Sequence, residues 1–144
     1  MASLRSNRND EPEALLMPRP GYVWAKALTP ARKAEITAAC EALVVETRAR
    51  FLPEIRPTAF NYPVDIRGRW RGESYSFIVR YRSGFPENEG EEFDAPYARI
   101  DHFNDRFGVQ WMRHTGRWWP LRDGLTLEEA VDFVRTEPVL RPVL

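Results

Sequence analysis

Apolar residues after position 35 repeat every three or four positions, the spacing that places them on one face of an α-helix. Thr29 precedes this stripe as a helix N-cap, and Pro30 takes the first helical position, where its missing N–H is not needed. We expect the helix to end near Phe51, just before Pro53. The stripe contains Ile36, Ala39, Cys40, Leu43, Val44 and Thr47.

A second, shorter helix is predicted near the end of the chain. Thr126 is its N-cap, and Glu129, three residues later, completes a capping box in which each residue satisfies an N–H of the other. Pro138 and Pro142 prevent the helix from continuing to the end of the chain. Its buried stripe contains Leu127, Ala130, Val131 and Val134.

Between the two helices the hydrophobic pattern changes to a period of two, which is typical of half-buried β-strands. Residues 62–82 predict a hairpin that turns at Arg71-Gly72. One face of the hairpin is apolar and contains Val64, Ile66, Tyr75, Phe77, Val79 and Tyr81. The other face is basic and polar, interrupted by Ile78, and contains Asp65, Arg67, Arg69, Ser74, Ser76, Arg80 and Arg82.

Three further strands are predicted at residues 97–103, 107–114 and 117–121. Alternation places Tyr97, Arg99, Asp101, Gln110, Met112 and His114 on one face, and Ala98, Ile100, His102, Val109, Trp111 and Arg113 on the other. The adjacent Trp118 and Trp119 must point to opposite faces, and whichever is exposed is a candidate anchor for a partner. The acidic segment 83–94 is predicted to be an exposed loop, and it matches no calcium-binding loop.

These elements predict a single α+β domain, with an antiparallel sheet of about five strands, one long amphipathic helix packed on one face and a short C-terminal helix. Residues 21–137 form the predicted domain, residues 1–20 a flexible N-terminal arm and residues 138–144 a C-terminal tail. The 144 residues suffice for one hydrophobic core.

Composition narrows the function only a little. No apolar run is long enough to span a membrane and no signal peptide is evident, so we expect a cytoplasmic protein without membrane contact. The formal net charge is zero, so no global field attracts nucleic acid. Cys40 is the only cysteine, which excludes an internal disulfide, and no motif indicates a cofactor.

The most promising functional surface is the basic face of the sheet. Guanidinium groups alternating along strands can bind the carboxylates of an acidic protein surface or follow nucleic-acid phosphates, with the ring of Trp70 stacking on a base. A solvated face without a partner, in a chain whose arginine content follows genome composition, is the alternative. The candidate binding residues are Arg67, Arg69, Trp70, Arg80, Arg82 and Arg99.

Enzymatic and metal-binding functions have weaker support. Asp101 and His114 share a predicted face and form a candidate acid–base pair for a small hydrolase or nuclease, but no serine or cysteine nucleophile accompanies them. His102 and His114 fall on opposite faces, which argues against a shared metal ion. We therefore favour a non-enzymatic interaction module, with sequence-independent nucleic-acid binding and hydrolysis as the alternatives.

Several of these segments together resemble a known family. The matching features, within residues 56–134, are Arg56-Pro57, the arginine-rich hairpin at residues 67–72, Ala98, VQWMRHTGRW at residues 109–118 and the closing LTLEEAVDFV helix. The chain resembles the bacterial domain-of-unknown-function family 3024. The resemblance implies a small helix–sheet–helix domain and carries no assigned activity.

Overall fold

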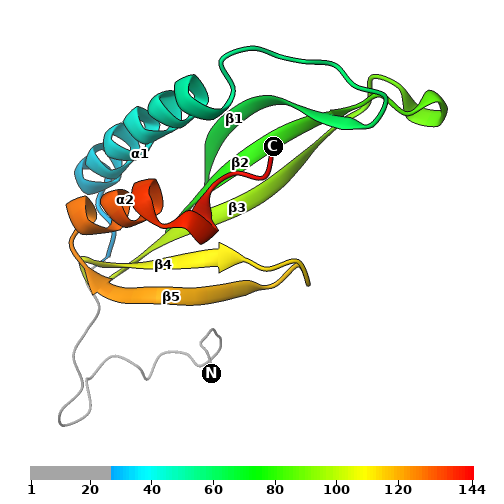
Figure 1. The fold of residues 1–144 in the computed structure, drawn as a ribbon. Helices are drawn as coiled ribbons and strands as arrows, with labels where there is room; N and C mark the ends of the chain where they lie inside the picture. The colour runs from blue at the N-terminus through cyan, green and yellow to red at the C-terminus, as the bar shows by residue number, and fades with distance from the viewer. Residues whose placement is uncertain (1–26) are drawn as a thin grey trace, which may run out of the picture.

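The computed structural model describes residues 27–144, in which one antiparallel sheet is covered on one face by two helices (Figure 1). The strands follow each other in the sheet in the order β1-β2-β3-β4-β5. In chain order the elements are α1 (Pro30–Phe51), β1 (Asn61–Arg71), β2 (Ser74–Ser83), η2 (Pro86–Asn88), β3 (Glu92–Phe103), β4 (Arg106–Met112), β5 (Trp118–Leu125), α2 (Leu127–Thr136) and η3 (Pro138–Leu140). The predicted α+β fold is confirmed, and the predicted arm lies outside the described residues.

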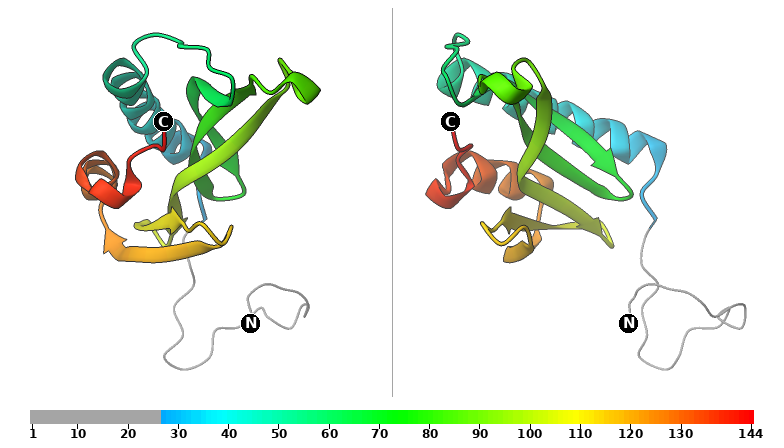
Figure 2. Two further views of the ribbon diagram at one scale, coloured as in Figure 1. Left: turned by 45° about the vertical axis from the view of Figure 1, so that its right-hand side comes forward. Right: turned by 90° about the vertical axis from the view of Figure 1, so that its right-hand side faces the viewer.

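Both helices begin at the predicted caps. The Thr29 hydroxyl accepts a hydrogen bond from the backbone N–H of Arg32, and Thr126 and Glu129 form the complete capping box. Helix α1 contacts β1 and β2, whereas α2 contacts α1 and lies over β3, β4 and β5. Figure 2 shows the two helices beside each other over the sheet. Within the described residues, no helix is long and apolar enough to cross a membrane.

The core lies between the helices and the sheet. It combines the stripes of α1 and α2 with inward-facing strand residues, chiefly Ile66, Tyr75, Phe77, Val79, Ala98, Ile100, Phe107 and Val109. Leu140 of η3 is also buried there, so the domain continues past residue 137 into the predicted tail. The two faces of the sheet therefore differ, since neither helix covers the opposite face.

Strand pairing in both hairpins differs by two residues from the predicted pairing, which set Trp70 opposite Glu73 and Phe103 opposite Gly108. The first hairpin turns at Gly72-Glu73, with φ of 62° at Gly72, so Trp70 pairs with Tyr75 rather than with Glu73. The second turns at Asn104-Asp105, where both residues have positive φ, and Phe103 pairs with Arg106. A slip of two residues does not by itself exchange the two faces, because strand side chains alternate with a period of two.

Three other predictions about the strands are wrong. Residues 92–94 belong to β3 and are not part of a loop, and β5 continues to Leu125. Tyr97 is buried in the core because a bulge between Phe77 and Ile78 leaves it without a partner in β2. An extra residue on one strand reverses the alternation beyond it, which exchanges the faces.

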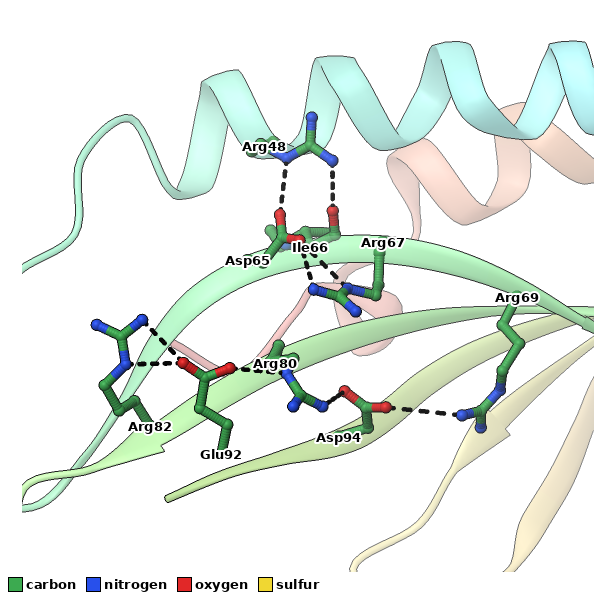
Figure 3. A network of polar contacts seen from close by, with 9 residues as sticks. All are labelled: Arg48, Asp65, Ile66, Arg67, Arg69, Arg80, Arg82, Glu92 and Asp94. Atoms are coloured by element: carbon green, nitrogen blue, oxygen red, sulfur yellow. Dashed lines mark hydrogen bonds and ion pairs between the residues drawn. The ribbon is translucent and has the colours of Figure 1, made fainter. Parts of the chain in front are cut away.

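The free edge of β1 is held by an arginine from the helix (Figure 3). Arg48 Nη2 donates to the carbonyl oxygen of Ile66 at 2.7 Å, and Arg48 Nε lies 3.1 Å from Asp65 Oδ1. The contact occupies an edge carbonyl that a strand from another molecule would otherwise use. It also fastens the C-terminal half of α1 to the sheet.

Replacing Arg48 with alanine is therefore expected to lower the free energy of unfolding by about 1 kcal/mol, since the guanidinium is partly exposed and the contact is screened by water. Urea denaturation followed by circular dichroism measures the change. Arg50→Ala is the matched control, because Arg50 only stacks on the neighbouring Phe51. Equal stability of both variants would show that Arg48 does not secure the edge.

Candidate binding face

The uncovered face is the side of the sheet opposite the helices. Cross-strand pairing connects Arg69 with Ser76, Ser76 with Arg99, and Arg99 with Gln110, so all four side chains lie on one face. The uncovered face contains Asp65, Arg67, Arg69, Arg71, Ser74, Ser76, Ile78, Arg80, Arg82, Glu92, Asp94, Pro96, Arg99, Asp101, Gly108, Gln110, Met112, Trp118 and Pro120.

A chain of ion pairs crosses this face, with arginines and carboxylates alternating (Figure 3). Glu92 lies 2.8 Å from Arg82 and 2.9 Å from Arg80. Asp94 lies 2.9 Å from Arg80 and 3.7 Å from Arg69, and so connects these two arginines. The predicted basic face is thus largely neutralised from within by the acidic residues of β3.

These contacts shift the pKa of the groups that make them. Hydrogen bonds from Arg82 and then Arg80 lower the pKa of the Glu92 carboxyl. Hydrogen bonds to Asp94 and Glu92 raise the pKa of Arg80, and the bond to Glu92 raises that of Arg82. The charges therefore persist across the physiological pH range, and the face stays polar.

Two smaller groups complete the charge pattern. Arg67 binds Asp65 at 3.0 Å, so Asp65 bridges the uncovered face and helix α1. Asp101 accepts hydrogen bonds from Ser74 at 2.6 Å and from Gln110, and its Oδ1 lies 2.7 Å from Arg99 Nε. Six arginines thus share four carboxylates on the uncovered face, which leaves an excess of positive charge.

Two hollows lie on the uncovered face. The smaller, of about 130 Å³, is lined by Arg69, Arg71, Ser74, Ser76, Pro96, Arg99 and Trp118. The larger is an open groove of about 710 Å³ beside the β3–β4 turn and β5, lined by Asp101, Phe103, Asn104, Arg106, Gly108, Gln110, Pro120, Leu121, Arg122, Asp123 and Gly124. Between the charges, Ile78 is fully buried.

Trp70 was predicted to be exposed near the turn of the first hairpin, close to the arginines, but it does not share their face. Its ring is half-buried on the helix side, where Nε1 donates to Thr37 Oγ1 at 2.8 Å and Lys33 lies over the ring. The aromatic residue on the uncovered face is Trp118, with the guanidinium of Arg99 4.8 Å from its ring centre. Trp119 points to the other face and is 51% exposed, as the alternation predicted for one of the pair.

The two candidate catalytic residues, Asp101 and His114, are not joined to each other. His114 sits in the turn after β4 rather than in a strand, and no hydrogen bond joins it to Asp101 in the part of the chain that is described. Asp101 is already bound by three side chains of the uncovered face. His102 is buried on the helix side, with Nδ1 3.0 Å from a Glu73 carboxylate oxygen.

No group of three or more histidine, cysteine or acidic residues is placed to hold a metal ion among residues 27–144. Burial raises the pKa of the Cys40 thiol to about 12, so that thiol is not a nucleophile at neutral pH. The arginines, carboxylates and serines of the uncovered face can form hydrogen bonds and ion pairs.

Several residues of the face were absent from the sequence prediction of the site. Glu92 and Asp94 flank Phe93, an alternation that indicates a strand although the segment is acidic. Ser74 and Ser76 were assigned to the correct face, but their short side chains gave no reason to expect a hollow. Arg71 was placed in a turn, and it is the last residue of β1.

The fold and this face define a small α+β domain with a five-stranded antiparallel meander, in which neither helix covers one face of the sheet. A family model described as domain of unknown function (DUF3024) matches residues 29–140, and the chain belongs to this family. Neither the curated proteins nor the solved structures contain a significant match.

Proposed function

We propose that the protein is a non-enzymatic cytoplasmic module that binds an acidic protein surface through the uncovered face. The supporting observation is that both helices lie on one side of the sheet while the other side carries more arginines than carboxylates. A partner's carboxylates can accept hydrogen bonds from those guanidinium N–H groups that do not take part in the internal ion pairs.

The internal carboxylates favour this proposal over sequence-independent nucleic-acid binding. A phosphate backbone lies across a surface as a dense row of negative charges. Glu92 and Asp94 occupy the middle of the arginine row and would repel such a backbone. Trp70, which was predicted to stack on a base, lies under α1. Separate carboxylates of a protein can instead bind between the internal acids.

A binding assay tests the proposal with a fluorescein-labelled peptide of alternating glutamate and glycine. We expect saturable binding that weakens about tenfold or more in the double variant Arg67→Glu/Arg82→Glu, because both charges are reversed on the uncovered face. Arg50→Ala, on the far side of the domain, is expected to bind as the unchanged protein does. Fluorescence anisotropy across a salt series gives the affinities.

A single-stranded oligonucleotide with the same label is the competing probe. Tighter binding of the oligonucleotide than of the peptide, with a steep loss of affinity in salt, would replace the proposal with nucleic-acid binding. Equal peptide affinity in the double variant and the Arg50→Ala protein would exclude the uncovered face as the binding surface.

A further inference from the structure

We propose that the smaller hollow of the uncovered face binds a phosphate monoester, carried on a phosphorylated side chain of a partner protein. This proposal rests on the proposed function, because the hollow is part of the same face. It specifies the acidic group that the uncovered face binds most strongly, and it places that group in the smaller hollow.

The hollow follows from the order of side chains across three strands. Ser76 in β2 pairs with Arg69 in β1 and with Arg99 in β3. Adjacent strands lie about 4.8 Å apart, so the two arginines rise about 10 Å apart with only a serine between them. Arg71 stands at the next outward position of β1, opposite Ser74. Long cationic side chains thus surround a floor of short hydroxyl-bearing ones.

The size of the hollow fits a phosphate group. Its volume of about 130 Å³ has room for several water molecules, and therefore for the few heavy atoms of a phosphate group. Trp118 and Pro96 supply an apolar wall against which the carbon atoms that carry the phosphate can pack.

The hollow also contains donors that the protein does not use internally. Arg71 is exposed and makes no ion pair or hydrogen bond through its side chain within residues 27–144. The Nε of Arg99 is buried and finds no aligned acceptor in the described chain, although Asp101 Oδ1 lies near it. Within residues 27–144, the one ion pair of Arg69 is the longer, 3.7 Å contact with Asp94.

The charge balance favours a phosphate monoester over a carboxylate. Three guanidinium groups line the hollow, and only Asp94 and Asp101 pair with them. A phosphate monoester carries about −1.5 to −2 charges at neutral pH and offers three strong acceptor oxygens, which suit bidentate arginine contacts. The same two carboxylates repel the neighbouring phosphates of a nucleic acid, so an isolated phosphate on a protein is favoured.

Nuclear magnetic resonance tests the site directly. Titration with phenyl phosphate is expected to shift the indole N–H signal of Trp118, which the Trp118→Phe variant identifies, and to saturate. Arg71→Ala is expected to weaken this binding about fivefold or more without unfolding the domain, because Arg71 is exposed and its side chain has no partner within the described residues. Arg141→Ala, an exposed arginine on the helix side, is the matched control.

Peptides that differ at one residue then identify the source of the phosphate. A glycine- and alanine-flanked phosphoserine peptide is expected to bind about tenfold more tightly than its serine and glutamate versions, and Arg71→Ala removes most of this difference. No shift of Trp118 with phenyl phosphate, or equal affinity for phosphoserine and glutamate, would overturn the proposal. Tighter, Arg71-dependent binding of a 5′-phosphorylated oligonucleotide would overturn the assignment to a protein.

The outcomes separate this proposal from the broader function. Binding of the glutamate–glycine peptide without any preference for phosphoserine leaves the acidic-partner function standing and removes the phosphate site. Binding of phenyl phosphate in the hollow without binding of the acidic peptide leaves the phosphate site standing and removes the acidic-partner function.

Discussion

Raising the pH from about 8 to about 11 is expected to lower the free energy of unfolding by about 5 kcal/mol. Burial raises the pKa of the Cys40 thiol to about 12, and it raises the pKa of the Tyr75 and Tyr97 hydroxyls above their usual range. The folded protein keeps these three protons after the unfolded chain has released them. Stability is therefore complete below the unfolded pKa values and falls as the pH rises through them.

Each of the three groups contributes roughly 1.4 kcal/mol per pH unit above its unfolded pKa, which is about 9 for the thiol and about 10 for the phenols. The total is comparable with the whole stability of a small domain, about 5–15 kcal/mol. Urea denaturation at a series of pH values, followed by circular dichroism, measures the loss.

Tyr97→Phe isolates one of these contributions. The hydroxyl of Tyr97 makes no hydrogen bond within the described residues, so its removal changes the packing little at neutral pH. Between neutral pH and a pH of about 11, the free energy of unfolding is expected to fall by about 1 kcal/mol less in the variant than in the unchanged protein. An unfolding free energy that stays constant from neutral to alkaline pH would contradict the burial of these groups.

Gly68→Ala is expected to destabilise the domain by about 3 kcal/mol, because β1 approaches the ring of Tyr75 too closely for a side chain. A Cβ atom at position 68 would lie 1.8 Å from the Tyr75 hydroxyl oxygen and 2.2 Å from Cζ. The ring cannot move aside, since it packs edge-on against Trp70 and Phe77 at centroid distances of 5.5 and 5.3 Å and its hydroxyl donates to Glu41.

Gly72→Ala serves as the control for this effect. Gly72 has open space around its Cα but a φ of 62°, so alanine there costs only about 1 kcal/mol of backbone strain. Thermal unfolding of the two variants separates steric overlap from strain. If Gly68→Ala proves no less stable than Gly72→Ala, the close packing of β1 against Tyr75 is wrong.

The helices and the faces of the sheet could be predicted because their signals are local. Thr29, Pro30 and the Thr126–Glu129 box mark the starts of α1 and α2 within a few residues of sequence. Alternation then separated the core residues of β1 and β2 from the arginines, even though the register differed by two positions. The choice of turn residues alters the register without altering the face.

The candidate site was predictable only in part, because it depends on which strands become neighbours. The five arginines were assigned to one face of the sheet, but the pairing that places Glu92 and Asp94 between them joins strands separated by a turn and a 3-10 helix. The bulge that buries Tyr97 reverses the alternation along β3, and residues 97–103 alone do not show it because the bulge depends on the pairing with β2. The hollow at Ser76 likewise depends on strand pairing, because it forms where β1 and β3 place Arg69 and Arg99 on either side of Ser76.

The central claim, that the uncovered face is the binding surface, is tested most directly by methyl signals of isoleucine. Ile78 lies on the uncovered face, whereas Ile66 and Ile100 lie in the core under the helices. During titration with the glutamate–glycine peptide, we expect the Ile78 methyl signals to shift and saturate while those of Ile66 and Ile100 stay in place. Shifts confined to the core isoleucines, with Ile78 unchanged, would contradict the claim.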